Sequence, residues 1–447
     1  MKKKLLATLL ASTMILSLTA CGDTKTAGKT SESSPTTSSK STEAEDVTLI
    51  AAWWGSQNRN DKFTAAFDAY TAENANVTFE TQINGFSDHL TAISAAAASD
   101  TMPDLIMLQT DYLKTYTDAD KLLDLTPYIE SGALDLSKVD ASVISTGKID
   151  DGIYGISAGN NAAALIYNKT LLDANDIEIK NLMNYEEFME VCRQVYTKTG
   201  VKTQIDNTAT FLEFISRENG VGLFEGAALG AESYEVFLPF FELIETGLKE
   251  GWLIDQSIKT ANGGATESQA IVNYSTPETQ SWCSFFNSNQ MVAIQSSAPE
   301  GVELDLVTMP CEDPASAYYI RQAMCWTIAA NSQNIDEAIE VLNYWINSET
   351  ANNIVLGEPG VPANNDIAAK VAAQLDETTA KTFDFVTNVV IPNSSEGNPP
   401  AEAGASRVRN ELTDEVVEKI AYGELTAEEA AKEFFDQANA IMADSAS

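Results

Sequence analysis

The chain has 447 residues, and its 65 acidic against 27 basic side chains give it a formal net charge of −38. A surface this acidic repels phosphate backbones, which argues against a nucleic-acid partner, and it repels anionic membranes unless the chain is tethered. The single histidine, His89, argues against a His-based catalytic triad or a multi-histidine metal site. We expect no metal and no cofactor, and the length indicates two or three domains.

The first twenty residues are typical of an export signal. Three lysines precede an apolar core, Leu5 to Leu18, which is too short to span a bilayer comfortably. This core leads into LTACG, which resembles the bacterial lipobox, in which the cysteine is lipidated and becomes the new N-terminus. We therefore expect residues 1–20 to be a lipoprotein signal peptide and Cys21 to anchor the protein in the bilayer, on the outer face of the bacterial cell membrane. A plain signal peptide followed by a chance cysteine is the alternative.

Residues 21–46 follow as a stretch rich in serine and threonine with almost no apolar side chains. Such a composition cannot bury a core, so we expect a flexible linker that lets the folded part stand away from the membrane. The folded part is expected to begin at Val47.

Strand and helix patterns alternate from Val47 onward, which predicts a mostly parallel sheet with helices on both faces. The predicted strands are Val47–Ala52, Val77–Glu80 and Asp104–Leu108. The helices between them carry Phe63, Phe67 and Tyr70 on one face and an alanine-rich run over Leu90–Ala98.

Polar and aromatic side chains follow the first and third of these strands. In such sheets ligands bind outside the carboxyl ends of the strands. The candidates there are Trp54, Gln57, Arg59, Gln109, Asp111 and Tyr112. An aromatic face beside amide, guanidinium and carboxylate groups suits a sugar, whose C–H faces pack on rings and whose hydroxyls need paired donors and acceptors. Each residue also has a simpler interpretation, such as core packing for the tryptophan and capping or ion pairing for the arginine.

The stretch from Asp151 to Thr170 is expected to link two large domains. It reads as a glycine-punctuated hairpin, a polar corner at Ser157–Asn161, and an apolar run that ends at Lys169. A strand that breaks at small and amide residues can serve as both a hinge and a ligand wall.

The second half of the chain is expected to be helical over Tyr185–Thr197 and Thr210–Trp252, with short strands at Met291–Gln295 and Cys325–Ala329. Gly357 to Pro362 is a turn-rich break, and Thr426 with Glu429 forms a capping box for the last helix. Cys311 and Cys325 flank one short segment and could form a disulfide, although single buried thiols fit equally well.

Taken together these motifs resemble the extracellular solute-binding protein family 1, the lipoprotein receptors of ATP-driven sugar importers built like maltose-binding protein. The resemblance rests on the order of the lipobox, the Ser/Thr-rich linker and the segments WWG, PDLIMLQTDYL, LLDLTPYI, DGIYGISAGNNAAALIYNK and GELTAEEAAKEF. It implies a periplasmic-binding-protein-like α/β fold, with two lobes joined by a three-segment hinge near 157–161, 321–326 and 357–361, and the ligand in the cleft. The implied lobes are residues 47–158 with 326–358, and 159–325 with 359–447.

The resemblance also extends the list of cleft residues beyond those named above. The positions that match cleft-lining segments add Asn160, Asn161, Gln295, Ser297 and Arg321. Two positions depart from the family pattern: Ser157 stands where many relatives have proline, and the segment after Ile294 lacks the glycine-aromatic pair often found there.

The implied function is a monomeric, membrane-anchored receptor that binds a sugar, more specifically an oligosaccharide, and hands it to the transmembrane subunits of an ABC permease. It would not be an enzyme. One alternative is a receptor of the same fold for a non-sugar solute such as a peptide, polyamine or metal. The other is a secreted glycoside hydrolase, which would need a pair of carboxylates roughly 5 Å apart if it retained configuration. No acid pair at the strand ends stands out, and Asp111 and Glu358 are candidates for that pair only in principle.

Overall fold

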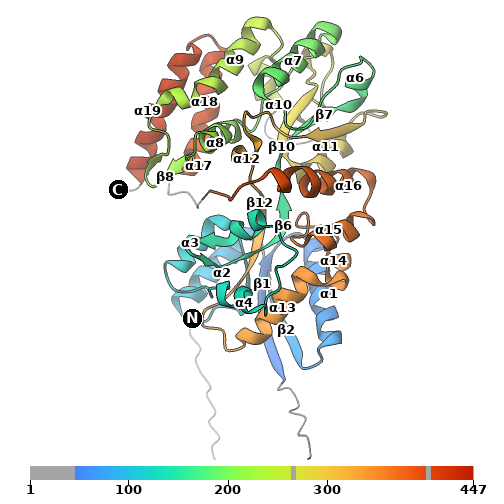
Figure 1. The fold of residues 1–447 in the computed structure, drawn as a ribbon, viewed down its shortest axis with the longest axis vertical. Helices are drawn as coiled ribbons and strands as arrows, with labels where there is room; N and C mark the ends of the chain where they lie inside the picture. Colours follow the sequence, from blue (N-terminus) through green and yellow to red (C-terminus); the bar gives the residue numbers. More distant parts are fainter. Residues whose placement is uncertain (1–45, 263–267, 399–403, 446–447) are drawn as a thin grey trace, which may run out of the picture. The chain divides into compact units, whose positions relative to one another are not determined.

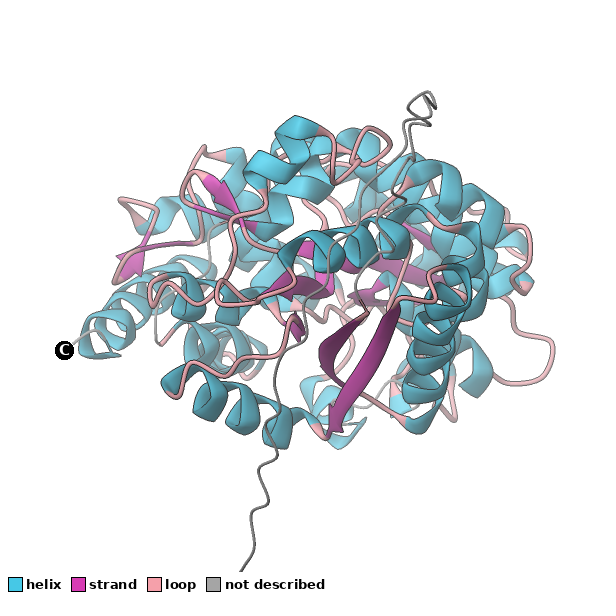
Figure 2. Ribbon diagram, turned by 90° about the horizontal axis from the view of Figure 1, so that it is seen from below, coloured by secondary structure: helices cyan, strands magenta, loops and turns pink. Residues whose placement is uncertain are grey.

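The structure, a computed structural model, describes residues 46–262, 268–398 and 404–445. The predicted signal segment, Cys21 and the linker up to residue 45 lie outside the described residues. Two β-sheets with helices packed around them form two α/β lobes (Figures 1 and 2). In the described part of the chain, every helix is too short or too polar to cross a bilayer.

The first sheet has five strands in the order β2-β1-β3-β12-β6. These strands are β1 (Val47–Trp54), β2 (Val77–Asn84), β3 (Leu105–Leu108), β6 (Ile156–Asn161) and β12 (Arg321–Ile328). β1 is parallel to β2 and β3, as the strand–helix alternation predicts, but β12 is antiparallel to both β3 and β6. The sheet is therefore mixed, because a strand from much later in the chain inserts between β3 and β6.

Helices α1 (Gln57–Glu73), α2 (Phe86–Ala98), α13 (Ile335–Asn347) and α14 (Glu349–Val355) belong to this lobe (Figure 1). α1 begins where the Ser56 side chain accepts a hydrogen bond from the Arg59 backbone N–H. Its buried Phe63 and Phe67 pack with Trp326 of β12 at ring-centroid distances of 6.0 and 5.8 Å. The predicted apolar stripe of α1 is confirmed, and aromatic contacts hold it on the sheet.

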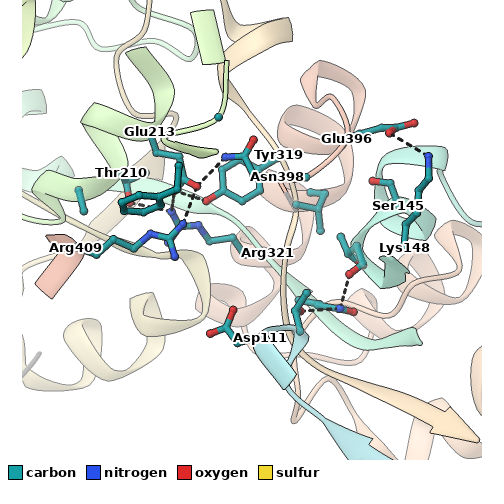
Figure 3. A pocket seen from close by; sticks show the side chains of 18 of the residues that line it. Asp111, Ser145, Lys148, Thr210, Glu213, Tyr319, Arg321, Glu396, Asn398 and Arg409 are labelled. Carbon is teal, nitrogen blue, oxygen red and sulfur yellow. Dashed lines mark hydrogen bonds and ion pairs between the residues drawn. The ribbon is translucent and has the colours of Figure 1, made fainter. Parts of the chain in front are cut away.

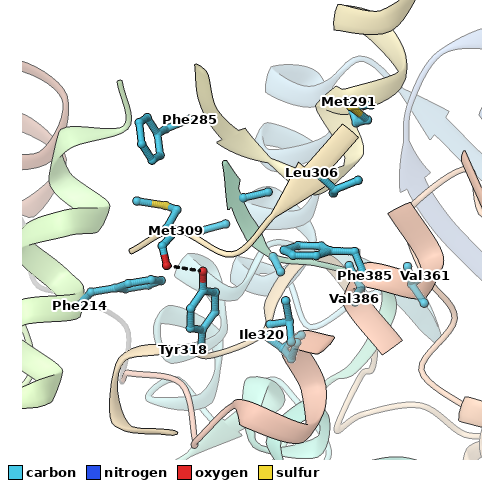
Figure 4. Close-up of a cluster of buried hydrophobic side chains, with 14 of the residues drawn as sticks. Phe214, Phe285, Met291, Leu306, Met309, Tyr318, Ile320, Val361, Phe385 and Val386 are labelled. Atoms are coloured by element: carbon cyan, nitrogen blue, oxygen red, sulfur yellow. Dashed lines mark hydrogen bonds between the residues drawn. The ribbon is translucent and has the colours of Figure 1, made fainter. Parts of the chain in front are cut away.

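The second sheet has three antiparallel strands in the order β10-β7-β11. They are β7 (Ala163–Asn168), β10 (Cys283–Asn287) and β11 (Leu304–Val307), and helices α7 (Tyr185–Thr199), α8 (Thr208–Glu218), α9 (Leu238–Glu250), α18 (Thr413–Ala421) and α19 (Ala427–Ser445) belong to the same lobe (Figure 1). Apolar side chains from β10, β11 and α8 meet residues from late in the chain in its core (Figure 4). The Tyr318 hydroxyl, fully buried there, donates a hydrogen bond to the Met309 carbonyl at 3.1 Å.

Three segments that the resemblance places at the crossings lie side by side. The chain passes from β6 in the first sheet to β7 in the second through Ala162. β6 pairs with β12, with register shifts between Gln322 and Cys325. The third segment joins them through two hydrogen bonds, Asn160 N–H to the Val361 carbonyl at 2.8 Å and Val361 N–H to the Asn160 carbonyl at 3.0 Å. We call these three stretches, 156–161, 321–328 and 357–361, the connecting segments.

Two expectations for the second half of the chain are wrong in detail. Met291–Gln295 is not a strand but the start of helix α11 (Met291–Ser297), in which Met291 and Ile294 are buried one turn apart while Val292 is 39 % exposed. Thr210–Trp252 is not continuously helical, because the hairpin of β8 (Phe224–Glu225) and β9 (Ala228–Leu229) interrupts it.

The remaining described elements are short. Those of the first half are α3 (Thr110–Thr117), α4 (Thr126–Ser131), α5 (Ala141–Ile144), β4 (Lys148–Ile149), β5 (Gly152–Ile153), α6 (Lys169–Asp173) and α10 (Gln256–Asn262). The later ones are α12 (Pro314–Ala317), α15 (Asn365–Ala372), α16 (Glu377–Asp384), α17 (Ala405–Arg407) and two π-helical segments, Phe385–Val390 and Val408–Leu412.

The four cysteines of the described chain are buried and unpaired, so Cys311 and Cys325 do not form the disulfide considered above. Burial raises the pKa of the Cys325 thiol to about 12, which keeps it protonated and unreactive.

We expect a Cys21→Ser variant, in which only these four thiols remain, to resist a soluble thiol reagent while folded. After denaturation the reagent should label all four thiols. Reductant should leave its melting temperature unchanged. Rapid labelling of one thiol in the native protein would contradict this burial.

Candidate ligand-binding site

A cavity of about 1110 Å³ opens between the two lobes (Figure 3). From the first lobe, residues of α3 and of the stretch 145–150 line it. From the second, the N-terminal turn of α8, the β8 hairpin, residues 396–398 and the start of the second π-helical segment contribute, and residues 319–322 run from this lobe into β12 of the first sheet. A cavity of this size is large enough for a ligand of more than one sugar ring.

Glu213 of α8 is the centre of the second-lobe wall. Its carboxylate accepts hydrogen bonds from the Tyr319 hydroxyl at 2.7 Å and the Asn398 amide at 3.0 Å. Arg321 and Arg409 each place Nη2 against it, at 3.2 and 3.4 Å (Figure 3). Burial alone would raise the pKa of Glu213, but the two arginines outweigh it, so the pKa lies below its ordinary value and the carboxylate is ionised.

A further arginine, Arg217, packs against this cluster and stabilises it. The guanidinium groups of Arg217 and Arg321 both lie over the Tyr319 ring, at 4.7 and 5.2 Å from its centroid. Arg217 also donates to the Ala317 carbonyl at 3.0 Å and to the Glu396 carbonyl at 2.7 Å. These bonds tie the segment 395–398 to the end of α12, just before β12, so the wall is fixed without a ligand.

The N-terminal turn of α8 carries the adjoining part of the wall. Asn207 adopts a left-handed conformation (φ 53°, ψ 38°) and its side chain accepts a hydrogen bond from the Thr210 hydroxyl at 2.7 Å. The same hydroxyl accepts from Arg321 at 2.9 Å, and the Thr208 hydroxyl donates to Asp414 at 3.0 Å. The helix start is therefore locked to both the arginine cluster and α18.

The first-lobe wall is polar and less tightly bonded. Gln322 donates to the Thr110 hydroxyl and the Thr146 carbonyl, both at 2.8 Å. Its Oε1 is buried and has no hydrogen-bond partner among the described residues, so it is available as an acceptor. Lys148 reaches across the cavity to Glu396 at 3.9 Å, and both side chains are exposed, so this pair contributes little to stability.

A smaller cavity of about 390 Å³ adjoins the first and shares Asn207 and Asp414 with it. Phe286 and Asn287 of β10 and Asp206 line it. The Asn287 Oδ1 is buried without a partner in the part of the chain that the structure describes. The two cavities therefore adjoin at Asn207, just before α8, and at Asp414 of α18.

Two of the residues predicted from the sequence, Asp111 and Arg321, line the main cavity. Gln109 is the N-cap residue of α3, and Tyr112 on the same helix packs on the apolar core beneath it. Asn160 and Asn161 are buried in β6, and both amide atoms of Asn160 are without a hydrogen-bond partner among the described residues.

The predicted residues after β1 lie outside the cavity lining. Trp54 is 8 % exposed and packs on Phe86 and His89, each at 5.3 Å between ring centroids. Arg59 pairs with Glu358 at 2.6 Å and donates to the Trp54 carbonyl, so Glu358 is engaged in this ion pair. Gln57 donates to Asp61 within α1.

Gln295 and Ser297 also lie outside that lining and form local bonds. Gln295 donates to the Val302 carbonyl at 3.0 Å and accepts from the Leu304 N–H at 2.8 Å, which ties α11 to β11. The Ser297 hydroxyl donates to Ala293 within the same helix. These bonds follow from the helical conformation of a segment that the sequence pattern suggested was a strand.

Sequence reasoning missed Glu213, Tyr319, Asn398 and Arg409. One signal was available: Glu213 stands in the run Phe211-Leu212-Glu213-Phe214-Ile215, where every neighbour is apolar and buried. A charged residue within such a run needs a partner, because an unpaired buried charge is costly. The partners themselves come from segments about 100 and 200 residues away, as the sequence separations of 108 and 196 show.

No group of three or more His, Cys, Asp or Glu side chains suited to hold a metal ion occurs in the described ranges. The wall instead offers guanidinium, amide, hydroxyl and carboxylate groups, which form hydrogen bonds to a polar organic ligand.

Residues 65–382 match the family model for bacterial extracellular solute-binding proteins. Among solved structures, an extracellular solute-binding protein family 1 member from Alicyclobacillus acidocaldarius superposes with a TM-score of 0.81 at 20 % identity, over 90 % of this chain and 99 % of that one. An oligogalacturonide-binding protein from Yersinia enterocolitica gives 0.71 at 17 % identity, over 89 % and 100 %. A de novo designed cysteine esterase gives 0.76 at 16 % identity, over 89 % and 98 %. At these identities the likeness shows the fold and not the activity.

Proposed function

Because the chain belongs to the bacterial extracellular solute-binding protein family, we propose that it is a receptor of an ABC importer that binds a saccharide in the cavity between its lobes. The observation that carries the ligand class is the cavity wall itself. It is built from both lobes and presents guanidinium, amide, hydroxyl and carboxylate groups, the set that sugar hydroxyls need. The similarity to an oligogalacturonide-binding protein supports the same ligand class.

The proposed ligand is an oligosaccharide rather than a single sugar. The main cavity and the smaller one share two lining residues, Asn207 and Asp414. A chain of several rings would use both, with closure of the lobes about the connecting segments burying it. We retain the division into residues 47–158 with 326–358 and 159–325 with 359–447 as the proposed lobes.

We further propose that the protein acts as a monomer tethered through lipidated Cys21 and delivers its ligand to the permease subunits. The support for the tether is the order of basic residues, apolar core and cysteine at the start of the chain. Several acyl chains on one residue provide stable anchoring, because each buried methylene contributes about 0.8 kcal/mol.

Thermal unfolding of the purified protein against a panel of mono- and oligosaccharides tests this function. A ligand that binds only the folded state stabilises it by about 2.7 kcal/mol at a hundredfold excess over Kd. We expect a clear rise in melting temperature with an oligosaccharide, and recovery of the sugar unchanged. A flat panel would favour a non-sugar solute, whereas a sugar recovered cleaved would favour a hydrolase.

A further inference from the structure

We propose that Arg321 and Arg409 select a saccharide that carries carboxylates, a uronic-acid oligosaccharide, over a neutral one of the same length. This inference deepens the proposed function and rests on it. It comes from the way the two guanidinium groups are held, from the charges around them, and from what covers the aromatic rings of the cavity.

Both arginines line the main cavity and keep guanidinium donors that are not used in hydrogen bonds to the described residues. Arg321 uses Nη2 for Glu213 and Thr210, and Arg409 uses Nη2 for Glu213 alone. A guanidinium has five N–H donors, so each arginine retains several that form no hydrogen bond with the described residues. Their side chains are 27 % and 32 % exposed, and both line the main cavity (Figure 3).

The two groups are also held in place before any ligand arrives. Glu213 fixes one edge of each, the Tyr319 ring lies 5.2 Å from Arg321, and the Phe224 ring lies 4.9 Å from Arg409. A planar donor fork that is already ordered loses little conformational entropy when it binds a planar carboxylate. Such charge-assisted pairs are shorter and stronger than neutral hydrogen bonds.

The charge balance at the inner wall is positive. One buried carboxylate, Glu213, faces two guanidinium groups, so the cluster has a net charge of +1. The cavity lining as a whole has six acidic and four basic side chains, but Asp111, Asp150, Glu225 and Asp414 are exposed. Water screens exposed charges far more than half-buried ones, so we expect the two arginines to contribute most of the attraction for a carboxylate bound at this wall.

In the main cavity, stacking on aromatic rings is not readily available to a neutral sugar, whereas Phe285 and Phe286 line the smaller cavity. Phe224 and Tyr319 are the aromatic residues of the main cavity lining among the described residues. Guanidinium groups already lie over both rings: Arg409 over Phe224, and Arg217 with Arg321 over Tyr319. The wall therefore recognises charge in preference to an apolar sugar face.

Calorimetric titration of the full chain with matched trisaccharides tests the inference. The probes are trigalacturonate, trimannuronate and triguluronate, the methyl ester of each, and neutral trisaccharides of the same length. We expect one uronate to bind at least about tenfold more tightly than its ester, as a charge-assisted hydrogen bond predicts. Its affinity should fall as salt is raised, whereas the affinity of the ester should not.

Arg409→Gln should lower the affinity for the uronate at least tenfold and leave the affinity for the methyl ester unchanged. Arg321→Gln should change the two affinities in the same direction. Arg409 is the better test because it is the more exposed of the two, and an unchanged melting temperature shows that the fold is intact. The matched control is Arg407→Gln, two residues away, whose side chain is 64 % exposed and pairs with Glu411 outside the cavity lining.

Equal binding of the uronate and its ester, or an Arg409→Gln variant that keeps the preference, would overturn the inference while leaving a saccharide receptor in place. No binding of any charged or neutral sugar would overturn the proposed function, and this inference with it.

Discussion

Glu213→Ala is expected to lower the free energy of unfolding by about 3–5 kcal/mol and to abolish ligand binding. The substitution leaves Arg321, Arg409, the Tyr319 hydroxyl and the Asn398 amide without the acceptor they share. Two half-buried positive charges would then face each other without compensation. Denaturant unfolding gives the free energy, and calorimetry with the sugar that the thermal-unfolding panel selects gives the affinity.

Glu411→Ala is the matched control. Glu411 pairs with Arg407 near the surface, and its side chain is 63 % exposed, so its loss should cost less than about 1 kcal/mol. If Glu213→Ala unfolds within 1 kcal/mol of the unmodified protein, the cluster is not what holds the cavity wall together.

The same carboxylate gives this region a pH dependence. The pKa of Glu213 is lower in the folded protein than in the unfolded chain, so ionisation stabilises the fold. This contribution is complete above the unfolded pKa and is lost as the pH falls through the folded pKa. The difference in unfolding free energy between the unmodified protein and Glu213→Gln should therefore be constant near neutral pH and shrink below about pH 4.5.

Gly159→Ala is expected to cost about 3 kcal/mol or more, because the connecting segments have no space for a side chain there. A Cβ on Gly159 would lie 2.5 Å from the carbonyl carbon and oxygen of Pro359 and 2.6 Å from the Gly360 nitrogen. These are backbone atoms and cannot rotate away. The paired hydrogen bonds between Asn160 and Val361 would have to break, and the two walls of the cavity would shift.

Melting temperature and sugar affinity should both fall in Gly159→Ala. The control is Gly85→Ala, where an added Cβ meets no atom within 4 Å and φ is −69°. Its cost should be about 1 kcal/mol, which is typical of alanine at a helix N-cap. If the Gly159→Ala protein is as stable and binds as well as this control, the connecting segments can make room for a side chain at residue 159, and the prediction is wrong.

The sequence pattern predicted an element correctly where the spacing of its apolar residues fitted either a strand or a helix but not both. Val47–Ala52 and Cys325–Ala329 are apolar, short and bounded by polar residues, and both are largely strands in the structure. Met291–Gln295 was equally apolar and short, and it is a helix. A run of five residues is too short to distinguish the two-residue repeat of a strand from the 3.6-residue repeat of a helix. In the folded protein Met291 and Ile294 are both buried, three residues apart, as one face of a helix requires.

The binding wall was harder to predict than the fold because it is assembled from distant segments. Asp111 follows a strand, where the topology of an open sheet places ligands, and it lines the cavity. Glu213 lies on α8, Tyr319 just before β12 and Arg409 on the second π-helical segment, and no rule of spacing joins them. Only their hydrogen bonds in the folded chain show that they form one cluster.

The position of β12 in the first sheet determines when that sheet can be completed as the chain is synthesised. β12 lies between β3 and β6, so the first sheet cannot close until Ile328 has been synthesised. Until then β3 and β6 each present an unpaired edge to the other half of the nascent chain. Joining strands so far apart in sequence closes a long loop, which is a slow step in folding.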